Sequence, residues 1–354
     1  MTDPLRKEIS ITMRVAMYYS NSDIRIEQMQ KPQIGPGELL IQVEASGICG
    51  SDVMEWYRIN KVPLVLGHEI GGVIVELGEG VTQYRVGDRI SASHHVPCYT
   101  CHYCLHGHHT VCETLRKTHF EPGGFAEYVR LPAINVDRGV YLLPDEISFE
   151  EATFIEPLAC VLRGQKIAGM QPGNSILIMG SGMAGLLHIH LAQSCGAGII
   201  IATDISDYRL TQATRFGANF TVSAKEDVPT RVKKINNGRL ADIVIICTSA
   251  TEAISQALQS VERGGTILFF APFTTPLSLK DIFWRNEITL TSSYAGNRAD
   301  HLTALELIRT RRVWVKEMIT HRLPLDQIQL GFQLVAEAKE SMKVIIEPQK
   351  ICRT

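Results

Sequence analysis

Short runs of alternating apolar and polar residues, separated by glycine and proline, fill the chain from Met13 to Pro132. They read MRVAMYY, GELLIQVEASG, GHEIGGVIVELGEG, YRVGDRISAS and GGFAEYVRLP. Alternation with a period of two between turn residues is typical of half-buried strands. The first part of the chain is therefore predicted to be β-rich.

The pattern changes near Ser175. The apolar runs SILIMG, IIIATD, ADIVIICTSA and GGTILFF alternate with the helical segments MAGLLHIHLAQSCGA, DYRLTQATRFGA and TEAISQALQSVERG. Strands that alternate with helices predict a parallel sheet with crossover helices, so the fold class is α/β. After Tyr294, the helical segment HLTALELIRTRR and a mixed tail follow, and we expect the tail to return to the first domain.

Composition adds limits to this picture. The chain has 354 residues, enough for about two domains, and a net charge of -2, which gives no reason to expect a nucleic-acid or membrane surface. The N-terminal segment MTDPLRKEIS is polar, unlike a secretory signal, and no apolar run approaches the ~20 residues of a membrane span. Four of the nine cysteines fall within fifteen residues, which favours metal thiolates in a reducing cytoplasm.

A glycine pattern suggests a nucleotide site. MGSGMAG supplies a G-x-G-x-x-G fingerprint directly after the strand SILIM and at the start of a helix; its residues are Gly180, Gly182, Met183, Ala184 and Gly185. The first glycine allows a tight turn, the second lets the backbone approach a pyrophosphate, and the third lets helix and strand pack closely. The context predicts a Rossmann domain; the alternative is the same fold with a vacated pocket.

The second strand of this domain ends in Asp204, nineteen residues beyond Gly185. A carboxylate there accepts hydrogen bonds from ribose hydroxyls and repels a 2′-phosphate, so NAD is expected rather than NADP. Arg209 lies nearby and leaves NADP open, because an arginine can accommodate that phosphate.

The stretch PCYTCHYCLHGHHTVC, Pro97–Cys112, is here called the cysteine lobe. Its four cysteines have C-x2-C-x2-C-x7-C spacing, which can surround a tetrahedral zinc and leave no position for substrate; they are Cys98, Cys101, Cys104 and Cys112. Such an ion would stabilise a lobe with little core of its own, whereas the alternative is free or disulfide-bonded cysteines. Its histidines, His102, His106, His108 and His109, are expected to be mostly solvated.

A second candidate metal set is dispersed along the chain. GICGSD supplies Cys49, LGHE supplies His68 and Glu69, and FIEPLAC supplies Glu156. One thiolate, one imidazole and one carboxylate leave a fourth zinc position open, which is the catalytic arrangement. Residue types alone do not prove the site, since a lone histidine before a glutamate is more often structural.

The ordered motifs C-G-S-D, G-H-E, four cysteines, E-P-L and G-x-G-x-x-G resemble the zinc-dependent medium-chain dehydrogenase/reductase family over nearly the whole chain. E-P-L points to the sorbitol (polyol) dehydrogenase-like branch, which is similar to threonine and galactitol-phosphate dehydrogenases. The resemblance implies a GroES-like β-barrel catalytic domain at 1–157 and 297–354 with a structural zinc lobe at 97–112, and a Rossmann doubly wound domain at 158–296. The active site would lie in the cleft between them.

The same resemblance implies a catalytic zinc held by Cys49 and His68, with Glu69 and Glu156 as direct or water-linked partners. Which carboxylate ligates at rest stays open. In alcohol dehydrogenases proper a cysteine usually stands where Glu156 does, and Cys160 is four residues too late for that role. With one structural zinc added, two zinc ions per subunit are expected.

The family also implies a proton route. Ser51 matches the first hydroxyl of a relay, but the family's histidine, five residues after the ligand cysteine, is Met54 here. Methionine cannot carry a proton, so the relay ends in water or uses another group, for example Glu55 or Glu156. Asp52 is expected to be a structural carboxylate that caps or pairs near the zinc loop.

Six residues are expected near the substrate by position against the family: Tyr57, Arg58, His94, His119, Phe120 and Tyr294. Their polar groups suit a hydroxylated substrate. Arg58 either recognises a phosphate or carboxylate or is a solvated loop residue. The strand-like run ITLTSSY predicts pairing between subunits, giving a homodimer or homotetramer.

The predicted function is a zinc- and NAD-dependent dehydrogenase that acts on the CH–OH group of a polyol-like secondary alcohol. The alternatives are a threonine-type amino-alcohol or sugar-phosphate dehydrogenase, and a zinc-free quinone or enone reductase on the same fold. From another class, the chain could be a catalytically silent nucleotide-binding structural protein, because fold alone does not determine function.

Overall fold

A computed structural model describes residues 11–273, 276, 279 and 282–351, so the polar N-terminal segment 1–10 lies outside the described residues. The chain forms two compact units. Unit 1 comprises Met1–Ile155, Val315–Glu337 and Lys343–Thr354, and unit 2 comprises Glu156–Trp314 and Ala338–Met342. The domain boundaries expected from the sequence, which differ somewhat from those of the two units, remain a prediction.

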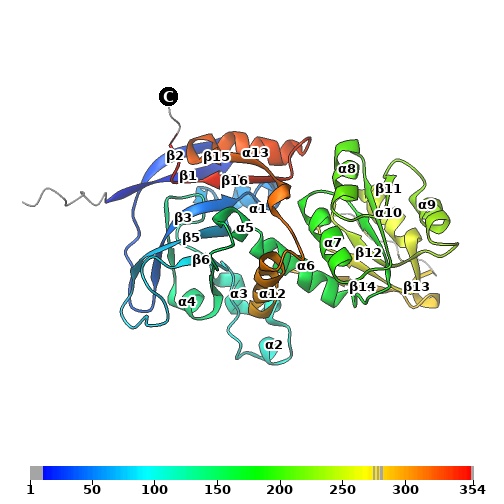
Figure 1. The fold of residues 1–354 in the computed structure, drawn as a ribbon, viewed down its shortest axis with the longest axis horizontal. Helices are drawn as coiled ribbons and strands as arrows, with labels where there is room; N and C mark the ends of the chain where they lie inside the picture. Colours follow the sequence, from blue (N-terminus) through cyan, green and yellow to red (C-terminus); the bar gives the residue numbers. More distant parts are fainter. Residues whose placement is uncertain (1–10, 274–275, 277–278, 280–281, 352–354) are drawn as a thin grey trace, which may run out of the picture. The chain divides into compact units, whose positions relative to one another are not determined.

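Unit 1 is built on two sheets (Figure 1). The larger has seven strands, with the order β15-β16-β3-β5-β6-β8 and β7 paired to β3. Their bounds are β3 Leu39–Gly47, β5 Glu69–Leu77, β6 Arg89–Ala92, β7 Tyr128–Leu131, β8 Val140–Leu142, β15 Ile319–Pro324 and β16 Lys343–Glu347. The smaller sheet has the order β2-β1-β4, with β1 Thr12–Ser20, β2 Asp23–Gln30 and β4 Leu64–Val65.

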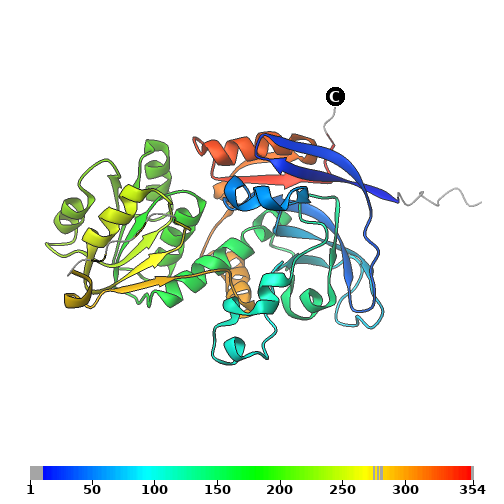
Figure 2. The ribbon, with the colours of Figure 1, turned by 180° about the vertical axis from the view of Figure 1, so that it is seen from behind.

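The alternating sequence of unit 1 explains its core. Leu39, Ile41 and Val43 of β3 are fully buried and pack with buried apolar residues of β5, β6 and β7. The predicted tail returns here, because β16 pairs with β3, as both views of the ribbon show (Figures 1 and 2). Short helices connect the strands: α1 Glu55–Arg58, η1 Ile59–Lys61, α2 His102–Leu105, η2 His109–Val111, α3 Glu113–Lys117, α4 Ala133–Gly139, α5 Phe149–Ala152, η3 Lys316–Met318, η4 Leu325–Gln327 and α13 Ile328–Glu337.

Unit 2 contains one six-stranded, wholly parallel sheet of order β11-β10-β9-β12-β13-β14. Counted along the chain this is the 3-2-1-4-5-6 order of the Rossmann fold. The strands are β9 Ser175–Met179, β10 Ile199–Asp204, β11 Phe220–Ser223, β12 Ala241–Ile246, β13 Val261–Phe269 and β14 Thr289–Ser292. The predicted parallel sheet is confirmed.

Helices accompany the parallel strands of unit 2 (Figure 2). They are α6 Ile155–Ile167, α7 Met183–Ser194, α8 Asp207–Arg215, α9 Val228–Ile235, α10 Thr251–Ser260, α11 Ile282–Arg285 and α12 Arg298–Arg309. Every residue of the central strand β9 is buried, which matches its unbroken apolar sequence. Within the described part of the chain, none of the helices is both long and apolar enough to span a membrane.

Candidate metal and cofactor sites

Strand pairing in unit 1 assembles the first site. Cys49 follows β3, and His68 directly precedes Glu69, the first residue of β5. The two strands are antiparallel with Gly47 opposite Glu69, so the loop after β3 is brought beside the start of β5. Ligand atoms of Cys49, His68 and Glu69 all lie within 4.8 Å of one another. We call these three residues the dispersed site.

Asp52 supports two members of the dispersed site from the loop after β3. Its side chain is fully buried; Oδ2 accepts the backbone N–H of Cys49 at 3.0 Å, and Oδ1 lies 3.5 Å from Nδ1 of His68. Burial opposes ionisation, but the charge and hydrogen bond of His68 and the charge of Arg58 hold the pKa of Asp52 below its usual value. Asp52 is thus the structural carboxylate that the sequence suggested, and it fixes the imidazole so that Nε2 is left for a ligand.

His68 responds to the same neighbours. Burial lowers the pKa of its imidazole, but the charge and hydrogen bond of Asp52, and then the hydrogen bond and charge of Cys49, outweigh burial and raise it well above the usual value. A carboxylate on one side of the imidazole and a thiol on the other therefore favour the positively charged, protonated form of His68. A divalent metal can take the place of the proton there.

Glu69 has a partner that the sequence analysis missed. Nζ of Lys343, at the start of β16, donates a hydrogen bond to Oε2 of Glu69. Both side chains are only 1% exposed, so the two groups form a buried ion pair. A Cβ on Gly47 would collide with both groups, so the glycine leaves room for this buried ion pair. Lys343 therefore holds one carboxylate oxygen of Glu69 and compensates its charge next to Cys49 and His68.

The loop after Cys49 carries the predicted relay hydroxyl. The backbone N–H of Ser51 donates to Sγ of Cys49 at 3.4 Å. Arg58, from the end of α1, reaches back to Ser51 and Asp52, and its side chain is only 15% exposed. It is therefore not the solvated loop arginine considered from the sequence. Met54 precedes α1 and has no group that can carry a proton.

Glu156 belongs to unit 2, in the first turn of α6. The thiol of Cys160, one helical turn later, donates to its Oε1 at 3.4 Å. This i, i+4 contact places the thiol of Cys160 beside the carboxylate of Glu156 on one face of α6. That Glu156 joins the dispersed site stays a prediction.

The donor chemistry of the dispersed site fits zinc. Thiolate, imidazole and carboxylate are the three ligand types of zinc enzymes, and three protein donors leave a coordination position for substrate. The supporting carboxylate on His68 and the ammonium group on Glu69 are the outer contacts that orient such ligands. Cys49, His68 and Glu69 would therefore hold the ion.

The cysteine lobe brings its four thiols together within one loop. All four Sγ atoms lie within 4.8 Å of one another, with 3.6 Å between Cys112 and Cys98 and 4.0 Å between Cys98 and Cys104. A tetrahedron with zinc–sulfur bonds of about 2.3 Å has edges of about 3.8 Å, so these separations fit a zinc site. The eight cysteines among the described residues form no disulfide, which removes that alternative for them.

Hydrogen bonds within the lobe favour the thiolate form of Cys98. The hydroxyl and N–H of Thr100 and the N–H of Cys101 lower the pKa of Cys98 to about 5, whereas burial raises that of Cys104 to about 12. Apolar packing is small, because only Cys104, Cys112 and Leu115 are buried in the lobe's cluster. His102, His106 and His108 are exposed as expected, and His109 is half-buried beside the ring of Tyr99.

The nucleotide fingerprint lies between β9 and α7 in unit 2. Gly180 has φ +94°, a left-handed conformation that glycine adopts without strain, and its N–H donates to the carbonyl of Thr203. Gly182 caps α7, and a Cβ there would meet nothing closer than the guanidinium of Arg209 at 3.8 Å. A Cβ on Gly185 would collide with the Gly180 carbonyl oxygen. These environments match the turn, approach and packing roles predicted for the three glycines, while Met183 and Ala184 form the first turn of α7.

Asp204 ends β10 beside this turn and is buried. Its Oδ2 accepts the N–H of Ser181 at 2.8 Å, and its Oδ1 accepts the N–H of Ser206 at 2.9 Å. The Arg209 guanidinium lies 3.8 Å from Oδ2. A carboxylate at the end of the second strand fits a ribose diol, and the N-terminus of α7 fits a pyrophosphate.

The predicted pocket residues divide between several environments. His94 lies against the dispersed site, with its ring centroid 4.7 Å from that of His68. Phe120 is buried in the core of unit 1 and meets His94 at its edge. His119 and Tyr57 are exposed, and Tyr294 is an exposed residue of unit 2. Of the six, His94 and Arg58 contact the region of the dispersed site.

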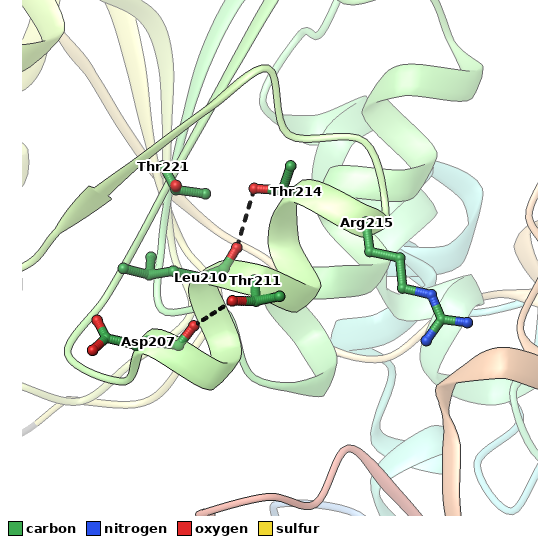
Figure 3. Close-up of a pocket in the computed structure, with 6 residues that line it drawn as sticks. All are labelled: Asp207, Leu210, Thr211, Thr214, Arg215 and Thr221. Atoms are coloured by element: carbon green, nitrogen blue, oxygen red, sulfur yellow. Dashed lines mark hydrogen bonds between the residues drawn. The ribbon is translucent and has the colours of Figure 1, made fainter.

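A separate hollow lies on the surface of unit 2 (Figure 3). It is lined by Asp207, Leu210, Thr211, Thr214, Arg215 and Thr221. The hydroxyls of Thr211 and Thr214 donate to carbonyls of their own helix, α8, so they are not directed at a ligand. None of the predicted site residues lines this hollow.

Comparison with known proteins shows which family the chain belongs to. The "Alcohol dehydrogenase GroES-like domain" model matches residues 35–145, and the "Zinc-binding dehydrogenase" model matches residues 184–310. The chain is 31% identical to sorbitol dehydrogenase of Bacillus subtilis, covering 96% of this chain and 98% of that protein. It is 32% identical to L-threonine 3-dehydrogenase of Bacillus licheniformis, covering 89% and 93%.

A solved structure, 2R,3R-butanediol dehydrogenase from Bacillus subtilis, superposes with a TM-score of 0.83 at 27% identity, covering 95% of this chain and 100% of that one. The predicted GroES-like and Rossmann fold is thereby confirmed. The chain belongs to the zinc-binding medium-chain dehydrogenase/reductase family, whose members act on alcohols or polyols with NAD(P).

Proposed function

We propose that the chain interconverts a secondary alcohol of a neutral, polyol-like compound and the corresponding ketone, using NAD and two zinc ions per subunit. The observation that carries the proposal is the dispersed site, with Ser51 two residues from its thiol. When bound, zinc lowers the pKa of an alcohol and polarises a carbonyl, while NAD accepts or returns the hydride.

The residues of unit 1 have distinct tasks in this proposal. Cys49 and His68 hold the ion, and Glu69 and Glu156 are its direct or water-linked carboxylate partners. Oγ of Ser51 accepts the proton of the substrate hydroxyl and releases its own proton. Because Met54 cannot receive that proton, it passes to water.

The residues of unit 2 bind the cofactor in this proposal. The glycine turn and the N-terminus of α7 receive the pyrophosphate, and Asp204 accepts hydrogen bonds from the adenosine ribose. The buried carboxylate disfavours a 2′-phosphate, so NAD is preferred, although Arg209 is close enough to moderate the repulsion. Binding of NADH and NADPH, followed by nicotinamide fluorescence, tests the preference.

We also propose that unit 2 joins two copies of the chain. The strand β14, within the predicted run ITLTSSY, is the last strand in the order of its sheet, and Trp284 and Tyr294 on either side of it are 66% and 54% exposed. A sheet edge that pairs with the same edge of a second copy protects its backbone groups. Light scattering after size-exclusion chromatography should give a dimer or a tetramer.

The function is tested with the zinc-loaded protein, NAD and a panel of sugar alcohols, cyclitols, diols, amino alcohols and sugar phosphates, by following NADH absorbance. We expect neutral polyols or diols to give the highest kcat/KM. A preference for threonine-like amino alcohols would favour the second candidate, which the 32% identity to an L-threonine 3-dehydrogenase supports. NADH binding without turnover of any alcohol would favour the catalytically silent alternative.

A further inference from the structure

Arg58 holds the backbone and the side chain of Ser51 at once. Its Nε–H donates to the carbonyl oxygen of Ser51 at 3.2 Å, and its Nη2–H donates to Oγ of the same residue at 3.4 Å. The two bonds come from adjacent nitrogens of a planar guanidinium, which fixes their relative direction. Ser51 is therefore oriented by the planar guanidinium group of one side chain from α1.

The charge of Arg58 is already compensated inside unit 1. Nη2 lies 3.7 Å from Oδ1 of the buried Asp52, and the guanidinium carbon lies 4.8 Å from the ring centroid of Tyr57. Because the guanidinium already interacts with a carboxylate, a carbonyl and a hydroxyl, it is poorly placed to bind an additional phosphate or carboxylate. This contact pattern favours a neutral substrate over an anionic one.

The direction of the Arg58–Ser51 bond limits what the hydroxyl can do. A guanidinium only donates, so one lone pair of Oγ is occupied, and the hydroxyl proton cannot be given to Arg58. The remaining lone pair can accept a proton, and the O–H must donate to some other group. The arginine thereby leaves Ser51 able to accept a proton on one side and release one on another.

From this geometry we infer that Arg58 is a positioning residue for proton transfer at Ser51, in a chain where Met54 stands at the usual place of the relay histidine. The inference rests on the proposed function of the dispersed site. Arg58 does not carry the proton; it holds Ser51 in the orientation from which the proton leaves to water. Sequence position alone could not show this, because Arg58 lies seven residues away and reaches back across α1.

The kinetic test compares Arg58→Met, Arg58→Lys, Ser51→Ala and the double variant in the zinc-loaded enzyme. We expect Arg58→Met to lower kcat roughly tenfold, the size of one charge-assisted hydrogen bond, with KM for the best neutral alcohol nearly unchanged. Arg58→Lys should recover part of the loss. In the Ser51→Ala background, Arg58→Met should change kcat less than twofold, because there is no hydroxyl left to orient.

The matched control is Arg25→Met. Arg25 is a 62% exposed arginine of the same unit, bonded to Asp23, and its loss should leave kcat and KM unchanged. Equal, multiplicative losses from Ser51→Ala and Arg58→Met would overturn the inference, because they would show independent action. Loss of one zinc per subunit in Arg58→Met would also overturn it, because the arginine would then support metal binding. A KM increase confined to phosphorylated or carboxylated substrates would overturn it too, because the arginine would then bind substrate.

A second readout does not depend on turnover. The N–H groups of Asp52 and Met54 donate to the carbonyls of Cys49 and Ser51 within the loop that Arg58 holds. Arg58→Met should raise hydrogen–deuterium exchange of the peptide spanning residues 50–54 about tenfold, whereas Arg25→Met should not. Unchanged exchange would overturn the positioning role even in an active enzyme. If the wild-type protein oxidised none of the alcohols while exchange was still raised in Arg58→Met, the proposed function would be rejected and the positioning role of Arg58 would stand.

Discussion

The cysteine lobe and the dispersed site are both metal sites by their donors, but they are built in opposite ways. The lobe takes four thiols from a single stretch of fifteen residues, Cys98 to Cys112, and orients them by N–H groups of the same stretch. The dispersed site takes three different donors from the loop after β3 and the start of β5. Its ligands are oriented by charged residues, Asp52 and Lys343, which are themselves buried.

This difference separates stability from chemistry. Four like ligands close the coordination sphere, so an ion in the lobe can only hold the loop together. Three unlike ligands with charged outer contacts leave one position open and need a rigid sheet around them. In the proposed function, the site with a local sequence pattern is thus the stabilising one, and the site without such a pattern is the reactive one.

The largest expected effect is on turnover, at Cys49. Replacing Cys49 with Ser removes the thiolate donor of the dispersed site, and we expect kcat to fall by about 10³-fold or more, because zinc supplies several kcal/mol to such a transition state. Zinc analysis should show one ion per subunit instead of two, and the melting temperature should change little. The exposed Cys195, replaced by Ser, is the control that should leave all three quantities unchanged. Full activity with one zinc lost would contradict the assignment of the chemistry to this site.

The reverse pattern is expected in the lobe. Replacing the buried Cys104 with Ser opens a site whose apolar cluster is small, and we expect a loss of about 4 kcal/mol in stability of the metal-loaded protein. Thermal unfolding measures it, and zinc again falls to one per subunit. Activity per folded molecule should stay within about threefold at low temperature, since the lobe has no position for substrate. A variant that keeps its stability but loses kcat would reverse the comparison.

The sequence predicted some parts of this comparison better than others. The strand alternation, the glycine fingerprint and the lobe spacing are local patterns, and they predicted the two-part fold and the four-thiol cluster. The partners of the dispersed site are not local: Lys343 lies 274 residues from Glu69. A signal was present, because Lys343 opens the strand KVIIE directly before three apolar residues, and a buried lysine needs a partner. Its partner could not be identified without the pairing of β16 and β3.

A somewhat smaller effect is expected at the buried ion pair. Lys343→Met leaves the Glu69 carboxylate buried without its partner, which should cost about 3 kcal/mol in the free energy of unfolding. Denaturant unfolding measures this cost. The double variant with Glu69→Gln should regain part of it, because no unpaired charge remains. The exposed Lys350, which pairs with Glu347, offers a control: Lys350→Met should cost less than about 0.5 kcal/mol. Equal losses at Lys343 and Lys350 would show that burial does not set the energy of this pair.

The smallest of these effects is expected at Asp52, which touches the dispersed site without belonging to it. Asp52→Asn keeps an oxygen for the N–H of Cys49 but removes the charge facing Nδ1 of His68. We expect zinc affinity at the dispersed site to fall about 10- to 100-fold, as for other supporting carboxylates of metal-binding histidines, while the lobe keeps its ion. Competition with a chromophoric chelator separates the two sites, because only the ion of the dispersed site should be withdrawn faster in the variant.

The control is Asp88→Asn. Asp88 is a turn carboxylate of the same unit that accepts the N–H of Arg85, and its replacement should leave both zinc affinities unchanged. Release of the lobe's ion from Asp52→Asn would show that Asp52 stabilises metal binding in the lobe and not at the dispersed site. The proposed separation of a stabilising metal centre from a reactive one would then be contradicted.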